Sequence, residues 1–261
     1  MIRFCTLYSS SSGNSVFVSD GDTNLLIDAG VSASKIITSL SEIGVSPQDI
    51  DGILVTHEHS DHISGIGVLS RKYNIPVYAN EKTMDAIQRT GVIMASGCMR
   101  TVVTGEPFTI RSAEVRAFKT PHDSVSSVGY TVTMDDTKLG VATDTGCITK
   151  PMLSALAGCR AVVIEANHDV NMLQNGPYPY PLKKRILSDS GHLSNENCAW
   201  LATQLALWGT KYIVLGHLSD KNNTPQKAYE ATSKMLSENG FSVDKDVILT
   251  VAMKSEITEI I

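Results

Sequence analysis

Four side chains of metal-binding type stand within six residues of this chain, in the run His57-Glu58-His59-Ser60-Asp61-His62. The run follows the apolar segment Gly52–Val55, which predicts a buried strand, and precedes Ile63–Leu69, which predicts a helix start. Alternate residues of an extended segment point to one side, so the first two histidines can bind one cation. The aspartate and the last histidine, at the helix start, can bind a second. The alternative to a metal site is a polar surface turn, but three histidines within six residues argue against it.

Three more side chains of the same chemistry follow strand-like segments elsewhere. His122 comes after Val115–Lys119, Asp144 ends the apolar run before Thr-Gly, and His217 comes after Tyr212–Leu215. Strand ends are where α/β architectures place their chemistry. Taken alone, each residue could equally be a cap or turn residue. Imidazole and carboxylate without thiolate suit zinc and also harder ions such as manganese or iron.

The motifs together resemble those of the metallo-β-lactamase superfamily of hydrolases, over nearly the whole chain. They are His-x-His-x-Asp-His, a separate histidine, Thr-Asp-Thr-Gly, a late Gly-His and the early Leu25–Gly30, whose Asp28 would be a structural support. The resemblance implies a four-layer αββα sandwich and two divalent metal ions. The first ion would be held by His57, His59 and His122, the second by Asp61, His62 and His217, with Asp144 bridging both.

Two positions narrow the chemistry that the resemblance implies. The antibiotic-cleaving members carry Cys or Ser where this chain has Asp144, and the diiron electron-transfer members carry Glu where it has His59. Two ions about 3.5–4 Å apart can share a hydroxide and stabilise an in-line displacement at phosphorus. These positions favour hydrolysis of phosphodiesters or thioesters over antibiotic cleavage or redox chemistry.

A second group of residues favours phosphodiesters. The segment Ser190–Ser194 is similar to the His-Ser-Thr motif of tRNase Z-type nucleases, and it opens the helix expected over Asn195–Leu207. By this resemblance His192 would give a proton to the leaving oxygen, Glu165 would orient it, and Asp61 would share in catalysis. A helix cap for His192 and a strand-end ion pair for Glu165 are the alternatives. His168 is expected to contact substrate or to support a ligand.

The segment Asn171–Arg185 combines prolines with aromatic and basic residues. We expect a loop that holds nucleic acid by stacking and by phosphate contacts, although an ordinary proline-rich surface loop remains the alternative. The serine-rich run Ser9–Ser15 is expected to overhang the site or to form a plain turn. The predicted substrate contacts, beside His168, are Tyr178, Tyr180, Lys183, Lys184, Arg185 and Asn14.

One branch of the superfamily matches more of these motifs. Ser-Gly-Asn near the N-terminus, Glu-x-Asn-His-Asp, Ser-Gly-His-Leu-Ser-Asn and the late Gly-His-Leu-Ser are similar to the bacterial YycJ (WalJ) group, described as DNA exonucleases. This resemblance implies a nuclease acting on nucleic-acid ends. The other enzymatic hypothesis is a small-molecule hydrolase of cyclic phosphodiesters or of thioesters, as in glyoxalase II-like proteins. A metal-stabilised scaffold without activity is the third.

Length and composition indicate the number of domains, the fold class and the cellular compartment. With 261 residues, 42% of them hydrophobic, we expect a single domain over residues 1–261, of α/β class with much antiparallel sheet. No stretch approaches the about 18 apolar residues of a membrane span. Five scattered cysteines without a Cys-x-x-Cys motif favour the reducing cytoplasm. A net charge of −5 argues against a broad basic surface, not against a nucleic-acid substrate. The oligomeric state stays open, a homodimer included.

Overall fold

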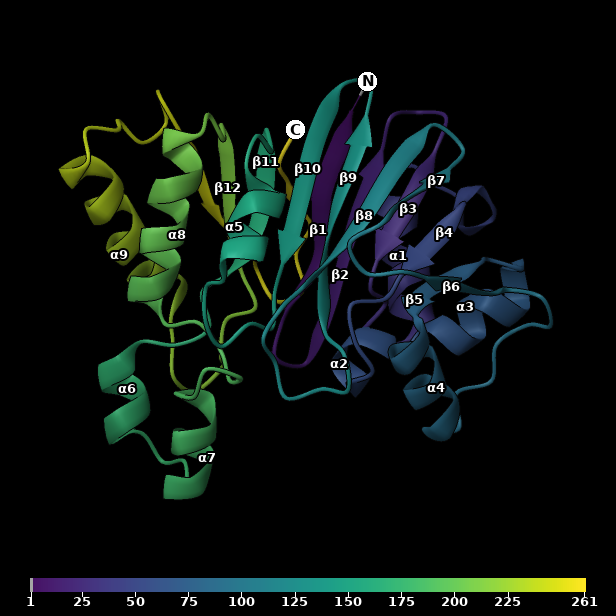
Figure 1. Cartoon of the computed structure of the whole chain (residues 1–261), viewed down its shortest axis with the longest axis horizontal. Helices are drawn as coiled ribbons and strands as arrows, with labels where there is room; N and C mark the ends of the chain where they lie inside the picture. Colours follow the sequence, from purple (N-terminus) through teal and green to yellow (C-terminus); the bar gives the residue numbers. More distant parts are fainter. Residues whose placement is uncertain (1) are drawn as a thin grey trace.

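The computed structural model describes residues 2–261, whose strands form two seven-stranded sheets packed face to face (Figure 1). The first sheet has the order β14-β1-β2-β3-β4-β5-β6. Its pairs are antiparallel from β14 to β3 and parallel from β3 to β6. Its strands are β1 Arg3–Ser10, β2 Gly13–Ser19, β3 Asn24–Ile27, β4 Gly52–Leu54, β5 Val77–Asn80, β6 Met99–Val102 and β14 Thr258–Glu259.

The second sheet has the order β13-β12-β11-β10-β9-β8-β7. It is antiparallel from β7 to β10 and parallel from β10 to β13, so each sheet joins an antiparallel half to a parallel half. Its strands are β7 Pro107–Ile110, β8 Ala113–Lys119, β9 Val128–Met134, β10 Thr137–Ala142, β11 Ala161–Glu165, β12 Tyr212–Gly216 and β13 Ile248–Val251.

Helices cover the outer faces of the two sheets. On the first sheet lie α1 Ala33–Glu42, α3 Ile66–Tyr73 and α4 Glu81–Arg89, with the short α2 Ser60–Ile63 and a 3₁₀ turn at Pro47–Asp49. On the second lie α5 Lys150–Leu156, α8 Asn195–Leu207 and α9 Pro225–Glu238. A pair of short helices, α6 Val170–Asn175 and α7 Tyr180–Ile186, projects below the sheets at the lower left of Figure 1. Within residues 2–261, no helix is long and apolar enough to cross a membrane.

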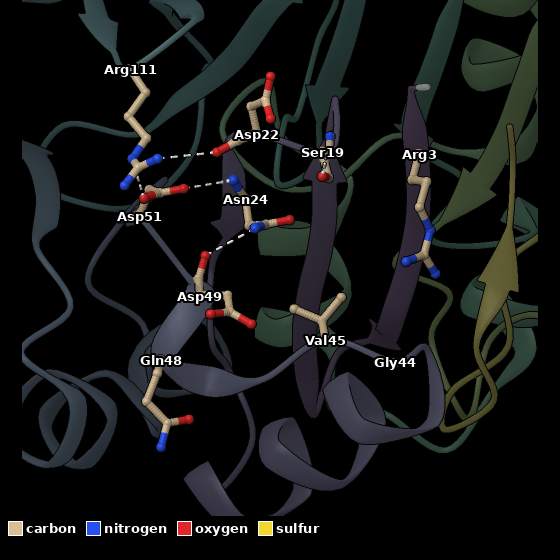
Figure 2. Close-up of a pocket in the computed structure, with 11 residues that line it drawn as sticks. Arg3, Ser19, Asp22, Asn24, Gly44, Val45, Gln48, Asp49, Asp51 and Arg111 are labelled. Carbon is tan, nitrogen blue, oxygen red and sulfur yellow. Dashed lines mark hydrogen bonds and ion pairs between the residues drawn. The ribbon is translucent and has the colours of Figure 1, made fainter.

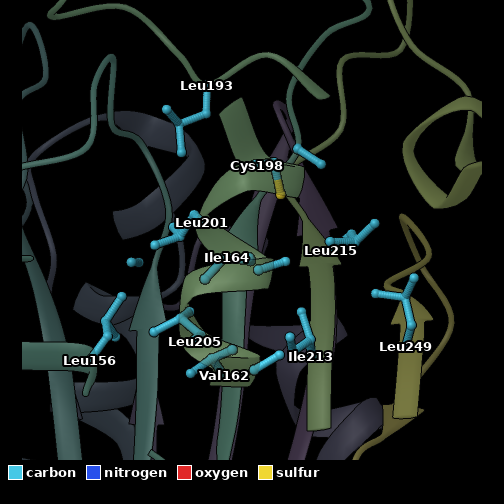
Figure 3. Close-up of a cluster of buried hydrophobic side chains, with 14 of the residues drawn as sticks. Leu156, Val162, Ile164, Leu193, Cys198, Leu201, Leu205, Ile213, Leu215 and Leu249 are labelled. Carbon is cyan, nitrogen blue, oxygen red and sulfur yellow. The ribbon is translucent and has the colours of Figure 1, made fainter. Parts of the chain in front are cut away.

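Three apolar cores separate these layers, which confirms the expected αββα sandwich. Strand β11 shows why: every residue is buried, and successive side chains point to opposite faces of the sheet. Val162 and Ile164 pack outward with Leu201 and Leu205 of α8 (Figure 3). Val163 packs inward, into the core that the two sheets share. The continuous apolar run is thus typical of a strand covered on both faces.

The expected loop over residues 171–185 is wrong, because this segment forms α6 and α7. The Asp169 carboxylate caps α6 by accepting a hydrogen bond from the Met172 N–H at 2.7 Å. Prolines 179 and 181 stand at the start of α7, where a missing N–H costs nothing. The prolines that favoured a loop therefore begin a helix instead. The sequence also predicts no strand over β6 or β14.

The two ends of the sheets differ in chemistry. The carboxyl ends of β4, β8, β10 and β12 lead to the predicted ligands, and those of β3 and β11 lead to Asp28 and Glu165. A polar cavity of about 490 Å³ lies where β1 and β3 begin (Figure 2). There Arg111 pairs with Asp51 at 2.6 Å, and Asp51 accepts the Asn24 N–H at 2.9 Å. These groups satisfy one another, and none belongs to the predicted site.

Candidate metal centre

Three site residues adopt left-handed backbone conformations directly beyond strand ends. Asp28 follows β3 with φ 61°, Asp144 follows β10 with φ 54°, and His217 follows β12 with φ 56°. This region costs about 1–2 kcal/mol for a residue with a Cβ. The Ser9 hydroxyl supports one of them by accepting the His217 N–H at 2.9 Å. Such strain concentrates where function needs a side chain aimed away from the strand path.

The structure brings all seven predicted ligands together. His57, His59 and His122 form one group, and Asp61, His62 and His217 form another. In each group the candidate ligand atoms lie within 4.8 Å of one another. The residues come from four separate chain segments, so only the folded sheets can gather them.

Asp144 lies between the two groups. Its Oδ2 is 3.0 Å from His62 Nε2, and its Oδ1 is 3.5 Å from the Nε2 atoms of both His122 and His217. The side chain is buried. A single carboxylate therefore faces histidines of both groups with its two oxygens, the arrangement that a bridging ligand requires.

Acceptors behind three histidines fix their orientation. Nδ1 of His62 donates to the Asp28 carboxylate at 2.7 Å, and Nδ1 of His217 donates to Glu165 Oε1 at 2.8 Å. Nδ1 of His122 donates to the Gly191 carbonyl at 3.1 Å. Each bond holds the proton on Nδ1 and leaves the Nε2 lone pair facing the cluster. A carboxylate or carbonyl behind a ligating histidine is the usual support of a metal site.

The geometry of the remaining pair also fits a shared ion. His57 Nε2 and His59 Nδ1 lie 3.1 Å apart. Two nitrogens bound tetrahedrally at 2.0–2.1 Å would be separated by about 3.3 Å. His217 Nε2 is buried and has no hydrogen-bond partner within residues 2–261, an orphaned acceptor that a cation would satisfy. The donor set and its spacing therefore fit two divalent ions.

Charge at the centre favours a cation. Burial alone would raise the pKa of Asp144, but the rings of His217 and His62 hold it well below its usual value. Burial lowers the pKa of His217, but the carboxylates of Asp144, Asp61 and Glu165 together raise it to about 10. Positive charge, from a proton or from a metal ion, is thus stabilised beside these carboxylates. Burial and the neighbouring His62 ring keep the pKa of His57 well below its usual value, so its lone pair is available.

His192, which is half-buried, and the buried Glu165 form a pair beside the cluster. His192 Nδ1 donates to Glu165 Oε1 at 2.7 Å, and Oε2 accepts the N–H groups of Thr145 and Leu193 at 2.9 and 3.2 Å. Burial lowers the pKa of His192, but the Glu165 carboxylate outweighs it and raises the pKa overall. His192 Nδ1 lies 3.7 Å from Asp144 Oδ1. Glu165 thereby links this ring to His217 through one oxygen.

Helix α7 carries most of the predicted substrate residues and is tied to the site. The guanidinium of Arg185 pairs with Asp123, the neighbour of His122. Lys183 Nζ donates to the Gln174 carbonyl at 2.8 Å and so joins α7 to α6. Tyr178 is half-buried, whereas Lys184 and Tyr180 are exposed, Tyr180 by 77%. Arg185 and Lys183 thus have protein partners, and the free surface is that of Tyr180 and Lys184.

Two predicted substrate contacts lie away from solvent. Asn14 is buried, and its Nδ2 lies 3.2 Å from His62 Nε2 and 3.4 Å from the Asp61 carbonyl. Its contacts are with the ligand cluster, so Asn14 supports the site rather than overhanging it. His168 is 1% exposed, and neither ring nitrogen has a hydrogen-bond partner within residues 2–261. Burial lowers its pKa to about 4. The ring is thus closed off from solvent, and its role, contact with substrate or support of a ligand, stays a prediction.

Two residues that support the site were not predicted from the sequence. Thr56 donates its hydroxyl proton to Asp28 at 2.8 Å, and the same oxygen lies 3.0 Å from His57 Nδ1. Glu58 accepts the Val125 N–H at 2.9 Å and so holds the loop that carries His122. Thr56 and Glu58 stand beside predicted ligands in the sequence, a signal that could have pointed to them.

Comparison with known proteins agrees with this geometry. Residues 23–218 match the family model described as the beta-lactamase superfamily domain. The chain is 40% identical over 242 residues to exodeoxyribonuclease YycJ of Bacillus anthracis. The aligned residues make up 93% of this chain and 92% of that protein. It is also 40% identical over 246 residues to exodeoxyribonuclease WalJ of Streptococcus pneumoniae, covering 94% and 91%.

Solved structures share the fold at low identity. The metallo-β-lactamase fold protein YhfI from Bacillus subtilis has a TM-score of 0.74 at 15% identity and covers 99% of this chain and 100% of its own. The short form of human tRNase Z has a TM-score of 0.67 at 17% identity, with 99% of both chains covered. The fold, the match across residues 23–218 and the identity with these relatives lead to one conclusion: the chain belongs to the β-lactamase superfamily.

Proposed function

We propose that the protein is a dinuclear metal-dependent phosphodiesterase, an exonuclease that acts on the ends of DNA. The observation that carries the proposal is the Asp144 carboxylate, which faces both histidine groups, with the His192–Glu165 pair beside it. Two relatives that match more than nine tenths of the chain are named exodeoxyribonucleases, which supports DNA as the substrate.

In this proposal the first ion is held by His57, His59 and His122, the second by Asp61, His62 and His217, and Asp144 touches both. Zinc or manganese fits these ligands best, and iron is a third choice. Divalent ions bound in such a site activate water and neutralise charge that develops on a phosphate. Asp28, Glu165 and Gly191 hold the ligating rings in place, a support that commonly affects metal affinity 10- to 100-fold.

His192 is proposed as the proton donor. Its Nδ1 is held by Glu165, so Nε2 is the free position that can give a proton to the leaving oxygen. The carboxylate raises the pKa of the ring and so favours the protonated form that a donor needs. The ring is only partly buried, with its side chain 18% exposed, so a bound phosphodiester can reach it.

The exposed surface of α7 is proposed to hold the nucleic acid. Tyr180 offers a stacking face, and Lys184, which has no hydrogen-bond or ion-pair partner among residues 2–261, can contact a phosphate. Tyr178 lies two residues before the first residue of the same helix. Lys183 and Arg185 contribute mainly by fixing α7, through Gln174 and Asp123. All five cysteines are free, which agrees with a place in the reducing cytoplasm.

End-labelled DNA and RNA provide the test. Purified protein, loaded separately with zinc and with manganese, should shorten DNA from one end and release mononucleotides. His192→Ala should abolish most of this activity. If neither metal supports cleavage of DNA or RNA while a small cyclic diester or a thioester is hydrolysed, the small-molecule hydrolase is the correct assignment.

A further inference from the structure

A groove of about 630 Å³ lies on the outer face of the second sheet, apart from the metal cluster. Helix α5 packs against part of this face, and Phe118 of β8 shares an apolar core with Met152 and Leu156 of α5. One wall is α5, and the other is the turn before β7. The lining residues include Thr104 and Gly105 from that turn, Arg116 and Lys119 from β8, Thr131 from β9 and Ser154 from α5.

The groove is basic at the end nearer the cluster. Arg116 and Lys119 are exposed, and neither has an ion-pair partner within the described chain. Lys138 also lines the groove and donates to the Ala157 carbonyl at 2.8 Å. The one acidic lining residue, Glu114, lies at the far end of β8. In a chain of net charge −5, two unpaired cations in a groove form a local site for a polyanion.

Strand β8, which contributes several lining residues of the groove, leads to the proposed ligand His122. Strand β8 ends at Lys119, three residues before His122. Six residues separate Arg116 from His122, and six residues span at most about 20 Å. A stacked strand advances about 3.4 Å per nucleotide, so this stretch matches no more than about six nucleotides.

We propose that this groove carries the part of a DNA strand that extends beyond the nucleotide held at the metal centre. The proposal rests on the exonuclease function above and adds a second contact region for DNA. This region offers positive charge, whereas the surface of α7 offers the aromatic ring of Tyr180. Arg116 and Lys119 contact phosphates, and the hydroxyls of Thr104 and Ser154 offer hydrogen bonds to phosphate or sugar. The Phe118 ring is 5% exposed and cannot stack on a base, so the groove holds the strand independently of its sequence.

The test compares strands of different length. The double variant Arg116→Gln/Lys119→Gln should bind a 16-nucleotide single strand roughly tenfold more weakly at 50 mM salt, with binding of a dinucleotide unchanged. The slope of log affinity against log salt should flatten by about 1.4, because two fewer phosphates are neutralised at about 0.7 each. Turnover of bis-p-nitrophenyl phosphate, measured in the same samples, reports on the metal centre.

A matched control removes the same charge elsewhere. Lys82 on α4 and Lys234 on α9 are exposed, and Lys82→Gln/Lys234→Gln should leave the length dependence at its wild-type value. If both double variants lost affinity for the 16-nucleotide strand equally, the loss would be a general effect of charge, and the proposed role of the groove would be wrong. Unchanged binding and slope in the groove variant would overturn it as well, and so would an equal loss for the dinucleotide and the 16-mer. Failure of the exonuclease function is a separate result: wild-type protein would then cleave neither DNA nor RNA.

Discussion

At the scale of single residues, the site depends on groups placed behind the predicted ligands. The Asp28 carboxylate accepts from His62 Nδ1, the Thr56 N–H and the Thr56 hydroxyl at 2.7–2.8 Å. It holds this place with a left-handed backbone, φ 61°, which asparagine also tolerates. A substitution that keeps the backbone but removes the charge therefore isolates the electrostatic support of His62.

Asp28→Asn should lower metal affinity or turnover 10- to 100-fold, the range usual for residues behind a ligand. Metal content after dialysis and kcat on a small diester measure the two effects. Asp135→Asn is the matched control, because Asp135 also has a positive φ, 46°, but is exposed in the turn between β9 and β10. Equal behaviour of the two variants would show that Asp28 does not support the site.

His192→Ala should keep its metal content and lose roughly 100- to 10,000-fold in turnover, as expected for a lost proton donor. A substrate with a good leaving group, such as p-nitrophenolate, needs less protonation and should lose less than DNA. Loss of metal in this variant would instead make His192 a ligand. Turnover at the wild-type level would leave it only the role of a residue before the α8 cap.

At the scale of elements, α7 connects the substrate surface to the ligands. Its last turn packs against the segment before His192: the His192 N–H donates to the Ile186 carbonyl at 3.0 Å. A Cβ on Gly191 would lie 2.2 Å from that same carbonyl oxygen, so only glycine fits there. The Gly191 carbonyl in turn accepts from His122. Movement of α7 is thereby coupled to the position of a proposed ligand.

Tyr180→Ala should weaken binding of single-stranded ends about 5- to 150-fold, since stacking on an aromatic ring is worth about 1–3 kcal/mol per base. Hydrolysis of a small diester should stay near its wild-type rate, because the exposed ring contacts none of the ligands. Trp200→Ala on α8, another exposed aromatic residue, is the control for nonspecific loss. A larger effect on the small diester than on DNA would favour the small-molecule hydrolase.

The sequence predicts an element well when neighbouring residues alone determine its structure, and poorly when contacts with distant residues determine it. The ligands of the cluster were predictable because four of them stand within six residues and the others complete motifs that resemble those of the metallo-β-lactamase superfamily, and the structure does bring them together. Helices α6 and α7 were missed because six or seven residues are too few to be stable alone. Tertiary bonds hold them, such as Lys183 to Gln174 and Arg185 to Asp123, which link residues 9 and 62 positions apart. Strand β14 has two residues, and its pairing with β1 spans almost the whole chain.

At the scale of the whole molecule, two half-parallel sheets bring their carboxyl ends to one edge, and the metal centre joins them. His57, His59, Asp61 and His62 follow the first sheet's β4, whereas His122, Asp144 and His217 follow strands of the second. Bound ions would therefore connect the two halves across their interface. A ligand at 100 times its dissociation constant stabilises the folded state by about 2.7 kcal/mol.

Removal of metal by a chelator should therefore lower the unfolding temperature, and returning zinc or manganese should restore it. His59→Ala should show a smaller difference between the metal-loaded and chelated forms, because at least one ion is lost. An unfolding temperature that does not respond to chelation would show that the ions, if bound, do not hold the halves together.

Metal stoichiometry tests the central claim most directly. Protein purified without chelators and analysed by inductively coupled plasma mass spectrometry should hold close to two equivalents of divalent metal per chain. His59→Ala should lose at least one of them, while His192→Ala should keep both. One equivalent or none in carefully loaded wild-type protein, or full metal content and activity in His59→Ala, would contradict the assignment of the seven ligands.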